Sequence, residues 1–269
     1  MADVAQGEDG EARLERGRRL HPARMPGVVS SALRDDILSG RLADGAHLPK
    51  EEELRAAFGV GRPAMREAMR ILEAEGLVSI VRGNRGGAVV RAPRHLHTAY
   101  ALALVLKSRG ARSRDVADAL REIEPVCAVL CARRDDRREV VIALTEIHAN
   151  SATVLDDPLA ATAAFRRFHE AIVSGCGNAT LALLVGALEA LWSSHVNDAS
   201  IRSPRPRTRQ DRQRSFDDHA AILDRLAAGD AEGTREAVFA HIGRVQGAPT
   251  LANVDAPLDV DRLRHELGL

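Results

Sequence analysis

Residues 48–78 decide the fold of the N-terminal part of the chain and read LPKEEELRAAFGVGRPAMREAMRILEAEGLV. A helix is expected over 50–58, because this segment follows a proline and carries acidic residues in its first turn, where the helix dipole favours them. The Gly-Val-Gly segment at 59–61 predicts a tight turn. A second helix begins at Arg62 with Pro63 in its first turn, where the missing N–H removes no helical hydrogen bond. Two short helices joined in this way predict a helix-turn-helix.

The residues on either side of this stretch complete a small domain. A helical pattern begins at Met25, and an alternating apolar run over 77–81 is followed by a turn rich in Gly and Arg and by apolar residues 88–90. Alternation of this kind predicts a β-hairpin. We therefore predict a winged helix-turn-helix over 25–92, with three helices and a hairpin, whose second turn helix lies in the DNA major groove.

Two arginines are the candidates for reading DNA bases. Arg62 and Arg66 lie one turn apart on the helix face opposite the apolar stripe. A guanidinium in this position can bind guanine O6 and N7 through two hydrogen bonds. An ordinary solvated helix face is the alternative. Between Val28 and Arg91 there are ten basic and nine acidic residues, so DNA affinity depends on their placement on one face and not on net charge.

The remainder of the chain has the pattern of an all-helical domain. No strand signal follows Pro93, and an arginine-rich segment with two prolines, 202–214, interrupts the helical periodicity and predicts an exposed loop. The fold class is therefore mainly α, a winged helix-turn-helix followed by a helical bundle. The predicted helices cover about 96–108, 115–134, 137–150, 158–174, 178–199, 215–228 and 230–246. The predicted order is a disordered tail (1–24), the winged domain (25–92), a linker with a first helix (93–110), the bundle domain (111–247) and a C-terminal extension (248–269).

Composition excludes several classes of protein. Only 3% of the residues are aromatic, which leaves too few rings for a base-stacking surface that binds single strands. Three cysteines are too few for a disulfide framework and indicate a reducing compartment. The first 24 residues lack an apolar signal segment, and the longest apolar tract, Ala171–Trp192, is interrupted by polar residues and glycines. We expect a cytoplasmic protein with no membrane partner.

Three histidines lie on apolar helix faces, where a titratable ring needs a partner. They are His169, His219 and His241, each on a separate predicted helix. Any one of them alone is more often a hydrogen-bonded core residue. Three imidazoles from facing helices of one bundle favour a shared divalent metal ion, and the sequence does not distinguish among Zn, Mn and Ni. The other seven histidines, His148 among them, are interpreted as surface or linker residues.

The N-terminal motifs resemble the GntR family of bacterial winged-helix regulators. The resemblance rests on about 65 residues in order, which include Ile37-Leu38-Ser39-Gly40, Leu48-Pro49, Phe58-Gly59-Val60, Arg62-Pro63, Arg66-Glu67-Ala68, Glu75-Gly76-Leu77-Val78 and the glycines at 83, 86 and 87. It implies DNA contacts from Arg62, Pro63 and Arg66, and a wing tip at Arg82 and Gly83. Gly61 departs from the family pattern, because the family usually has Ser or Thr there, and Glu52 stands where some members have Arg.

The helical part resembles the FCD effector domain of the FadR-type branch. The matching stretches are Arg121-Glu122-Ile123-Glu124-Pro125, Phe168-His169, Gly177-Asn178, His219 with Ile222-Leu223, and Gly229-Asp230 followed by His241. The resemblance implies a divalent ion beneath a carboxylate-binding pocket, held by three histidines and by an Asp or Asn four residues before the first. Phe165 occupies that fourth position here.

Two residues of this part are candidates for binding an effector. The planar guanidinium of Arg121 matches the carboxylate of a small organic acid, and its alternative role is an ion pair with Glu124 one turn away. Asn178 would either donate a hydrogen bond to the ligand or cap the following helix.

These patterns predict a homodimeric transcription regulator that binds an inverted-repeat operator in double-stranded DNA. A repressor is expected, and an organic acid bound in the helical domain near the ion would modulate its DNA binding. The alternative is a helical three-His metal-binding enzyme or sensor that keeps a vestigial winged helix. No Glu or Asp base accompanies any of the histidines as in HExxH, so no enzymatic activity is expected.

Overall fold

The computed structural model divides the chain between Pro93 and Arg94 into two units, which are described separately. The structure describes residues 25–81, 87–93, 95–202, 207–247 and 255–267, without the side chains of 195–202 and of residue 266. The predicted tail at 1–24 and the predicted wing-tip residues Arg82 and Gly83 lie outside these ranges.

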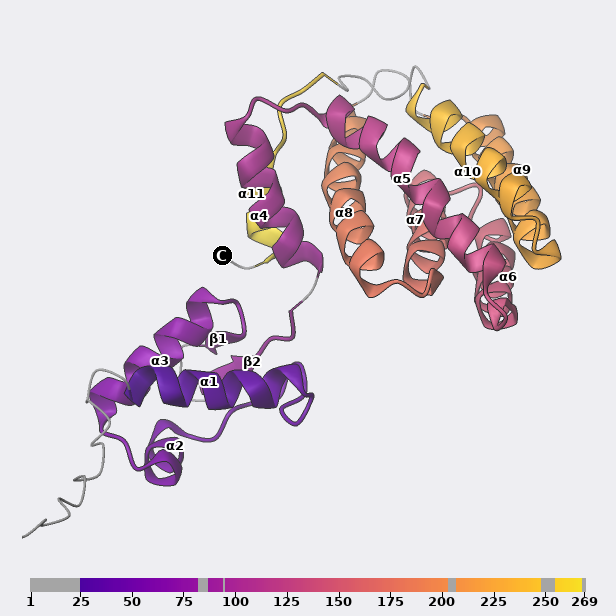
Figure 1. Cartoon of the computed structure of the whole chain (residues 1–269). Coiled ribbons are helices and arrows are strands. Elements are labelled where there is room, and N and C mark those ends of the chain that lie inside the picture. Colours follow the sequence, from indigo (N-terminus) through magenta and orange to yellow (C-terminus); the bar gives the residue numbers. More distant parts are fainter. Residues whose placement is uncertain (1–24, 82–86, 94, 203–206, 248–254, 268–269) are drawn as a thin grey trace, which may run out of the picture. The chain divides into compact units, whose positions relative to one another are not determined.

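The described residues of the first unit form three helices and a two-stranded hairpin (Figure 1). These elements are α1 (Met25–Leu38), α2 (Glu51–Phe58), α3 (Arg62–Ala74), β1 (Val78–Val81) and β2 (Gly87–Val90). The apolar faces of α1 and α3 meet in the core of this unit, where Val29, Met65, Ala68 and Leu72 are fully buried. Burial of this face orients the opposite, polar face of α3 toward solvent.

The turn between α2 and α3 depends on a glycine. Gly59 ends α2 with φ 63° and ψ 33°, a left-handed conformation that side chains with a Cβ rarely adopt. The N–H of Val60 then donates to the carbonyl of Arg55 at 3.1 Å, which closes the end of the helix. Gly61, in extended conformation, is the N-cap of α3, and Pro63 lies in the first turn of that helix. The predicted helix-turn-helix is confirmed.

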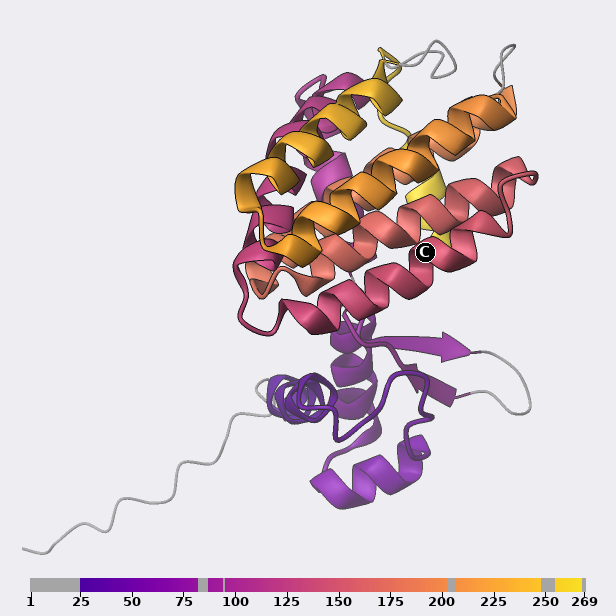
Figure 2. The same ribbon diagram turned by 90° about the vertical axis from the view of Figure 1, so that its right-hand side faces the viewer.

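The hairpin follows α3 directly and is antiparallel (Figure 2). Val78 pairs with Val90, and Val81 pairs with Gly87. The segment before α2 adds to this sheet, since the N–H of Leu48 donates to the carbonyl of Ala88 at 2.8 Å. The hairpin is therefore tied to the entrance of α2, and the predicted winged fold is confirmed.

The second unit is all-helical in its described residues, as the sequence predicts (Figure 2). Its helices are α4 (His95–Ser108), α5 (Ser113–Arg133), α6 (Arg137–Ala152), α7 (Pro158–Gly175), α8 (Ala179–Arg202), α9 (Arg209–Ala228), α10 (Ala231–Gln246) and α11 (Val260–Glu266). Phe168, Ile172, Ile222 and Leu226 are fully buried in its core, which holds α7 against α9. None of the described helices is both long and apolar enough to cross a membrane.

The predicted exposed loop at 202–214 is wrong for its second half. Thr208 and Asp211 form a capping box that starts α9 at Arg209, well before the predicted start of this helix. Arg212 is buried, and its guanidinium donates to the carbonyls of Leu155 and Arg207, each at 2.7 Å. Arginines in this segment therefore anchor α9 to the rest of the unit, a role that a high arginine content alone does not reveal.

The described C-terminal residues pack against the second unit. Leu258 and Leu263 are buried in its core, and α11 lies against α4 and α8. The carbonyl of Ala256 accepts from the N–H of Ser113 at 3.1 Å, at the start of α5. Residues 255–267 therefore link the beginning of α5 to α4 within this unit.

Candidate functional site

The first candidate site is the exposed face of α3. Arg62 and Arg66 lie on this face, with 65% and 69% of their side chains exposed, while the opposite face of the helix is buried. Glu51, in the first turn of α2, lies beside both: its carboxylate oxygens are 3.3 Å from Arg62 Nε and 3.9 Å from Arg66 Nε. The two arginines are thus adjacent, solvent-accessible and oriented by one acidic partner.

The N-cap of α3 provides a test of the local structure. No side chain caps this helix, because its N-cap is Gly61. We expect Gly61→Ser to stabilise the N-terminal unit by about 0.5–1 kcal/mol. The serine hydroxyl can cap the helix, and replacing glycine lowers the conformational entropy of the unfolded chain. A Cβ at this position meets only Pro63 Cδ, at 3.7 Å. Urea unfolding measures the change. Gly59→Ser is the matched control and should destabilise, because Gly59 has positive φ. An unchanged or lower stability of Gly61→Ser would contradict the capping argument.

The second candidate site is a cluster of three histidines in the helical unit. His169 comes from α7, His219 from α9 and His241 from α10, and their possible ligand atoms all lie within 4.8 Å of one another. The Nε2 atom of His219 lies 3.3 Å from that of His169 and 3.2 Å from that of His241. The structure therefore brings together all three histidines selected from the sequence.

Two carboxylates orient the outer histidines of this cluster. His169 Nδ1 lies 2.5 Å from Glu124 Oε1, and His241 Nδ1 lies 3.0 Å from Asp218 Oδ2. Arg244 in turn contacts Asp218 at 2.6 Å. When Nδ1–H donates to a carboxylate, the lone pair of a neutral imidazole is on Nε2. Both lone pairs are then directed toward His219 at the centre of the cluster.

His219 is the most deeply buried member. Its ring stacks on Phe168, with centroids 4.2 Å apart, and no hydrogen-bond partner for its Nδ1 is found among the described residues. Burial lowers its pKa well below the usual value, and the neighbouring His241 and His169 lower it further. Burial also lowers the pKa of His241, against the effect of Asp218. For His169 burial acts in the same direction, but the Glu124 carboxylate outweighs it and raises the pKa.

The arrangement fits a divalent metal ion. The Nε2 atoms of the three histidines lie so close together that their lone pairs repel one another unless the rings share protons. A cation between these atoms would be coordinated by the lone pairs and would remove the repulsion. Phe165, where the resemblance calls for Asp or Asn, contributes no ligand. Its ring lies edge-on to His219 with centroids 5.1 Å apart. An ion held by three protein ligands keeps a coordination position for water or a ligand oxygen.

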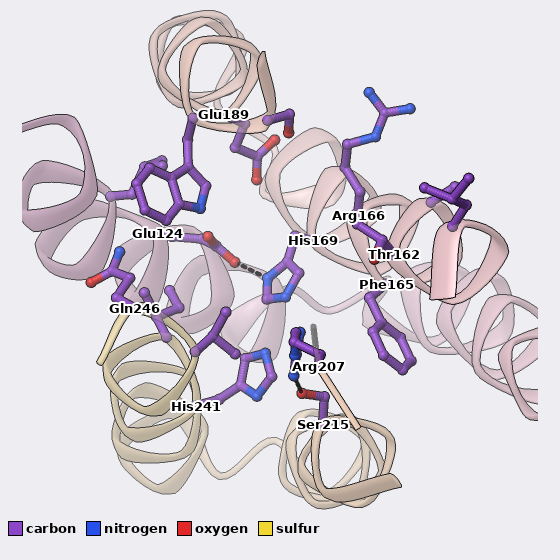
Figure 3. A pocket seen from close by; sticks show the side chains of 17 residues that line it. Glu124, Thr162, Phe165, Arg166, His169, Glu189, Arg207, Ser215, His241 and Gln246 are labelled. Carbon is purple, nitrogen blue, oxygen red and sulfur yellow. Dashed lines mark hydrogen bonds and ion pairs between the residues drawn. The ribbon is translucent and has the colours of Figure 1, made fainter. Parts of the chain in front are cut away.

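A cavity of about 190 Å³ adjoins this cluster (Figure 3). His169 and His241 form part of its wall, and the labelled side chains in Figure 3 approach it from several helices. Arg207 also lines it, and its Nη2 atom donates to Ser215 Oγ at 2.5 Å and to the Asp211 carbonyl at 3.2 Å. Burial lowers the pKa of Arg207, and the negative charge of Asp211 opposes this shift without forming an ion pair with Arg207 in the described part of the chain.

The effector candidates chosen from the sequence lie elsewhere. Arg121 does not line this cavity: its guanidinium lies 4.3 Å from the ring centre of Phe239 and lines a separate hollow with Gly243 and Gln246. Leu120 and Glu124 are the α5 residues that line the cavity. Arg121 directly follows Leu120 and therefore projects from a different side of the helix. Glu124 pairs with His169 in place of the predicted ion pair with Arg121.

Asn178 also lies away from the cavity wall. Its Oδ1 atom accepts from the backbone N–H groups of Thr180 and Leu181, each at 3.1 Å. It therefore caps α8, which was the alternative role that the sequence left open for it.

Several site residues were not selected from the sequence. Glu124 and Asp218 had a usable signal, because Glu124 lies within a selected motif, Asp218 directly precedes the selected His219, and metal-bound histidines commonly have carboxylate partners. His148 was interpreted as a surface or linker residue, but its ring stacks on Phe216 with centroids 3.9 Å apart and its Nδ1 atom is buried. The cavity residues Arg207 and Glu189 had no sequence signal of their own.

The comparisons with known proteins identify the class to which this architecture belongs. The model for bacterial regulatory proteins of the gntR family matches residues 27–90, and that for the FCD domain matches 115–244. The "Putative L-lactate dehydrogenase operon regulatory protein" of Escherichia coli (strain K12) is 30% identical over 254 residues, covering 91% of each chain. The chain belongs to the GntR family and is a DNA-binding transcriptional regulator with an FCD effector domain, not an enzyme.

Other relatives have related descriptions. The "Uxu operon regulator" of Haemophilus influenzae is 28% identical over 220 residues, covering 81% of this chain and 79% of that protein. The "HTH-type transcriptional repressor NanR" of Salmonella newport is 38% identical over 84 residues, which are 30% of this chain and 32% of that protein. Among solved structures, "Streptococcus agalactiae GntR" superposes with a TM-score of 0.56 at 19% identity, covering 83% of this chain and 100% of that one, and shares the fold.

Proposed function

We propose that this regulator is a repressor whose operator binding is released when a small carboxylic acid enters the cavity beside the histidine cluster. The observation that carries the proposal is Arg207, a partly buried cation in the cavity wall that forms no ion pair with a carboxylate among the described residues, although Asp211 acts on it at longer range. A buried charge is costly unless it is paired, so the guanidinium favours an anionic ligand.

Arg207 suits a carboxylate better than Arg121 does. Ser215 and the Asp211 carbonyl hold one guanidinium nitrogen, and the Nε atom of Arg207 is buried without a hydrogen-bond partner in the described structure. A ligand carboxylate would supply the missing charge-assisted hydrogen bond. We therefore replace the sequence-based choice of Arg121 by Arg207 as the anchor.

The three histidines are the proposed metal ligands. His169, His219 and His241 would hold a divalent ion, with Glu124 and Asp218 fixing the two outer rings. Such an ion supplies positive charge and an open coordination position at the cavity wall. The protein's own part is to present three neutral imidazoles there and to keep Phe168 packed behind them.

Operator recognition requires two copies of the chain. One N-terminal unit presents a single α3 and can read one half-site, so an inverted repeat is matched by a homodimer with two-fold symmetry. A bound dimer would occlude a promoter. The NanR relative, similar over 84 residues, is described as a repressor. A ligand weakens operator binding only by the difference in its affinity for the two states, about 1–3 kcal/mol.

A comparison of two arginine variants tests the proposed anchor. Arg207→Gln should weaken binding of a carboxylate by about 10- to 100-fold, because a charge-assisted hydrogen bond contributes about 1.5–3 kcal/mol. Arg121→Gln is the matched control and should leave the affinity nearly unchanged. Isothermal titration with a panel of organic acids that includes L-lactate measures both.

Operator affinity is measured on the same protein samples. An acid that binds wild type should lower its affinity for an operator selected from random DNA, and Arg207→Gln should require more acid for the same effect. Equal loss of acid binding in Arg121→Gln would restore Arg121 as the anchor. An acid that binds without changing operator affinity would refute the coupling.

A further inference from the structure

One carboxyl group in the cavity wall is left without a role by the proposed function. Glu189, on α8, lines the cavity and is only 8% exposed. Its Oε1 atom is buried and has no hydrogen-bond partner within the described ranges. The other charged groups of this wall already have a role: Glu124 pairs with His169, Arg166 lies 3.5 Å from Glu170, and Arg207 is the proposed anchor of the ligand carboxylate.

The surroundings of Glu189 favour a neutral carboxyl group. Burial raises its pKa well above the usual range, the negative charges of Glu124 and Glu170 raise it further, and the positive charge of Arg166 offsets only part of this shift. A neutral carboxyl has one O–H donor and retains acceptor capacity. Figure 3 shows the Glu124 and Glu189 side chains directed toward the same part of the pocket, where the Oε1 atom of Glu189 has no hydrogen-bond partner among the described residues.

A ligand hydroxyl matches this group better than a ligand ammonium does. A hydroxyl can donate to and accept from a neutral carboxyl at once. An ammonium would enter a cavity that already contains Arg166 and Arg207, and like charges there would oppose its binding. Thr162 and Ser193 line the same cavity and add hydroxyl groups to its wall.

The space beside Glu189 admits such a group. Glu189, Arg166 and Ser193 also line a second cavity, of about 610 Å³. The Glu189 side chain therefore lies where a ligand held in the first cavity would extend toward the second.

We propose that Glu189 is a specificity-determining residue that selects hydroxylated carboxylic acids over their deoxy analogues, by hydrogen bonding to a ligand hydroxyl while Arg207 holds the ligand carboxylate. This inference rests on the proposed function, because it requires a carboxylate ligand in this cavity. It predicts that the buried Oε1 atom gains its partner only when the ligand is bound.

Matched pairs of acids test this role in the full-length protein. Glycolate and acetate, 3-hydroxybutyrate and butyrate, malate and succinate, and gluconate and hexanoate are titrated by calorimetry. For at least one pair, wild type should bind the hydroxy acid about tenfold tighter or more. Glu189→Met should abolish this preference while the deoxy acid still binds. Glu189→Gln, which keeps a donor and an acceptor, should retain most of it, and so should Glu170→Gln.

The outcomes of this experiment distinguish failure of the proposed function from failure of the role of Glu189. Failure of all acids to bind wild type would overturn the proposed function and this inference together. Binding of acids without any preference for the hydroxy member, or a preference that survives in Glu189→Met, would overturn only the role of Glu189. Stronger binding of alanine or aspartate than of the matching hydroxy acids would replace hydroxyl by ammonium as the recognised group. Retained binding of the deoxy acid and an unchanged melting temperature exclude misfolding as the cause.

Discussion

Replacing His219 with alanine is expected to remove the metal ion and the stability that it provides. His219 lies between the other two histidines, so its loss leaves two imidazoles that no longer share a neighbour. Protein purified without a His tag should contain close to one divalent ion per chain in elemental analysis, and the His219→Ala variant none. Added Zn, Mn or Ni should raise the melting temperature of metal-stripped wild type only. At an ion concentration of 100 times Kd the stabilisation is about 2.7 kcal/mol.

His148 provides the matched control for this result. It is a half-buried histidine that packs against Phe216 and Phe168 but is not part of the three-histidine cluster. His148→Ala should therefore keep the ion. Glu124→Gln, which alters only the partner of His169, should weaken ion binding by about 10- to 100-fold. Wild type without metal, and with stability unchanged by all three ions, would mean that the cluster is a hydrogen-bonded part of the core.

Replacing either recognition arginine with alanine is expected to weaken operator binding. Arg62→Ala and Arg66→Ala should each cost about 1–3 kcal/mol and relax the preference at one base pair, because we propose that each guanidinium reads one guanine. Binding sites are selected from a random DNA pool with wild type, and the variants are then titrated with the selected operator at fixed salt. An inverted repeat with G·C pairs at the edges of its half-sites is expected from wild type.

Arg70 is the matched control on the same helix. Arg70 lies one turn after Arg66 toward the C-terminus of α3 and is as exposed as the other two arginines. Its guanidinium, however, pairs with Glu67 at 2.6 Å. Arg70→Ala should change operator affinity little. Arg82→Ala, at the predicted wing tip, should weaken all DNA sequences about equally. Failure to enrich any inverted repeat would contradict this mode of DNA recognition.

The winged unit was predictable because its signals are local. Pro63 and the glycines at 59 and 61 mark the turn within a few residues, and the alternation in 77–81 marks the hairpin. The three histidines were also predictable, since each lies on the apolar face of its own helix and the faces of a bundle must meet.

The cavity was not predictable in the same way. Leu120 lines the cavity, whereas the next residue of α5, Arg121, lies on Phe239 outside it. Helical periodicity in the sequence does not define the orientation of a helix about its axis to within one residue. Arg207 lies in a segment whose composition indicates a loop, and the hydrogen bonds of Arg207 and Arg212 in the folded structure show that this segment is anchored. Glu189 is part of an apolar helix, where nothing in the sequence marks the side on which its carboxyl group lies.

The acidic residue beside the recognition arginines has a consequence for how the regulator is distributed in the cell. Glu51 partly neutralises Arg62 and Arg66 in the free protein, so their attraction to phosphates of arbitrary sequence is reduced. A genome offers very many such competing sites, and the share of protein they retain depends on non-specific affinity. The proposed guanidinium–base hydrogen bonds would form only at the operator, so a weaker general attraction would leave a larger share of the protein on the operator itself.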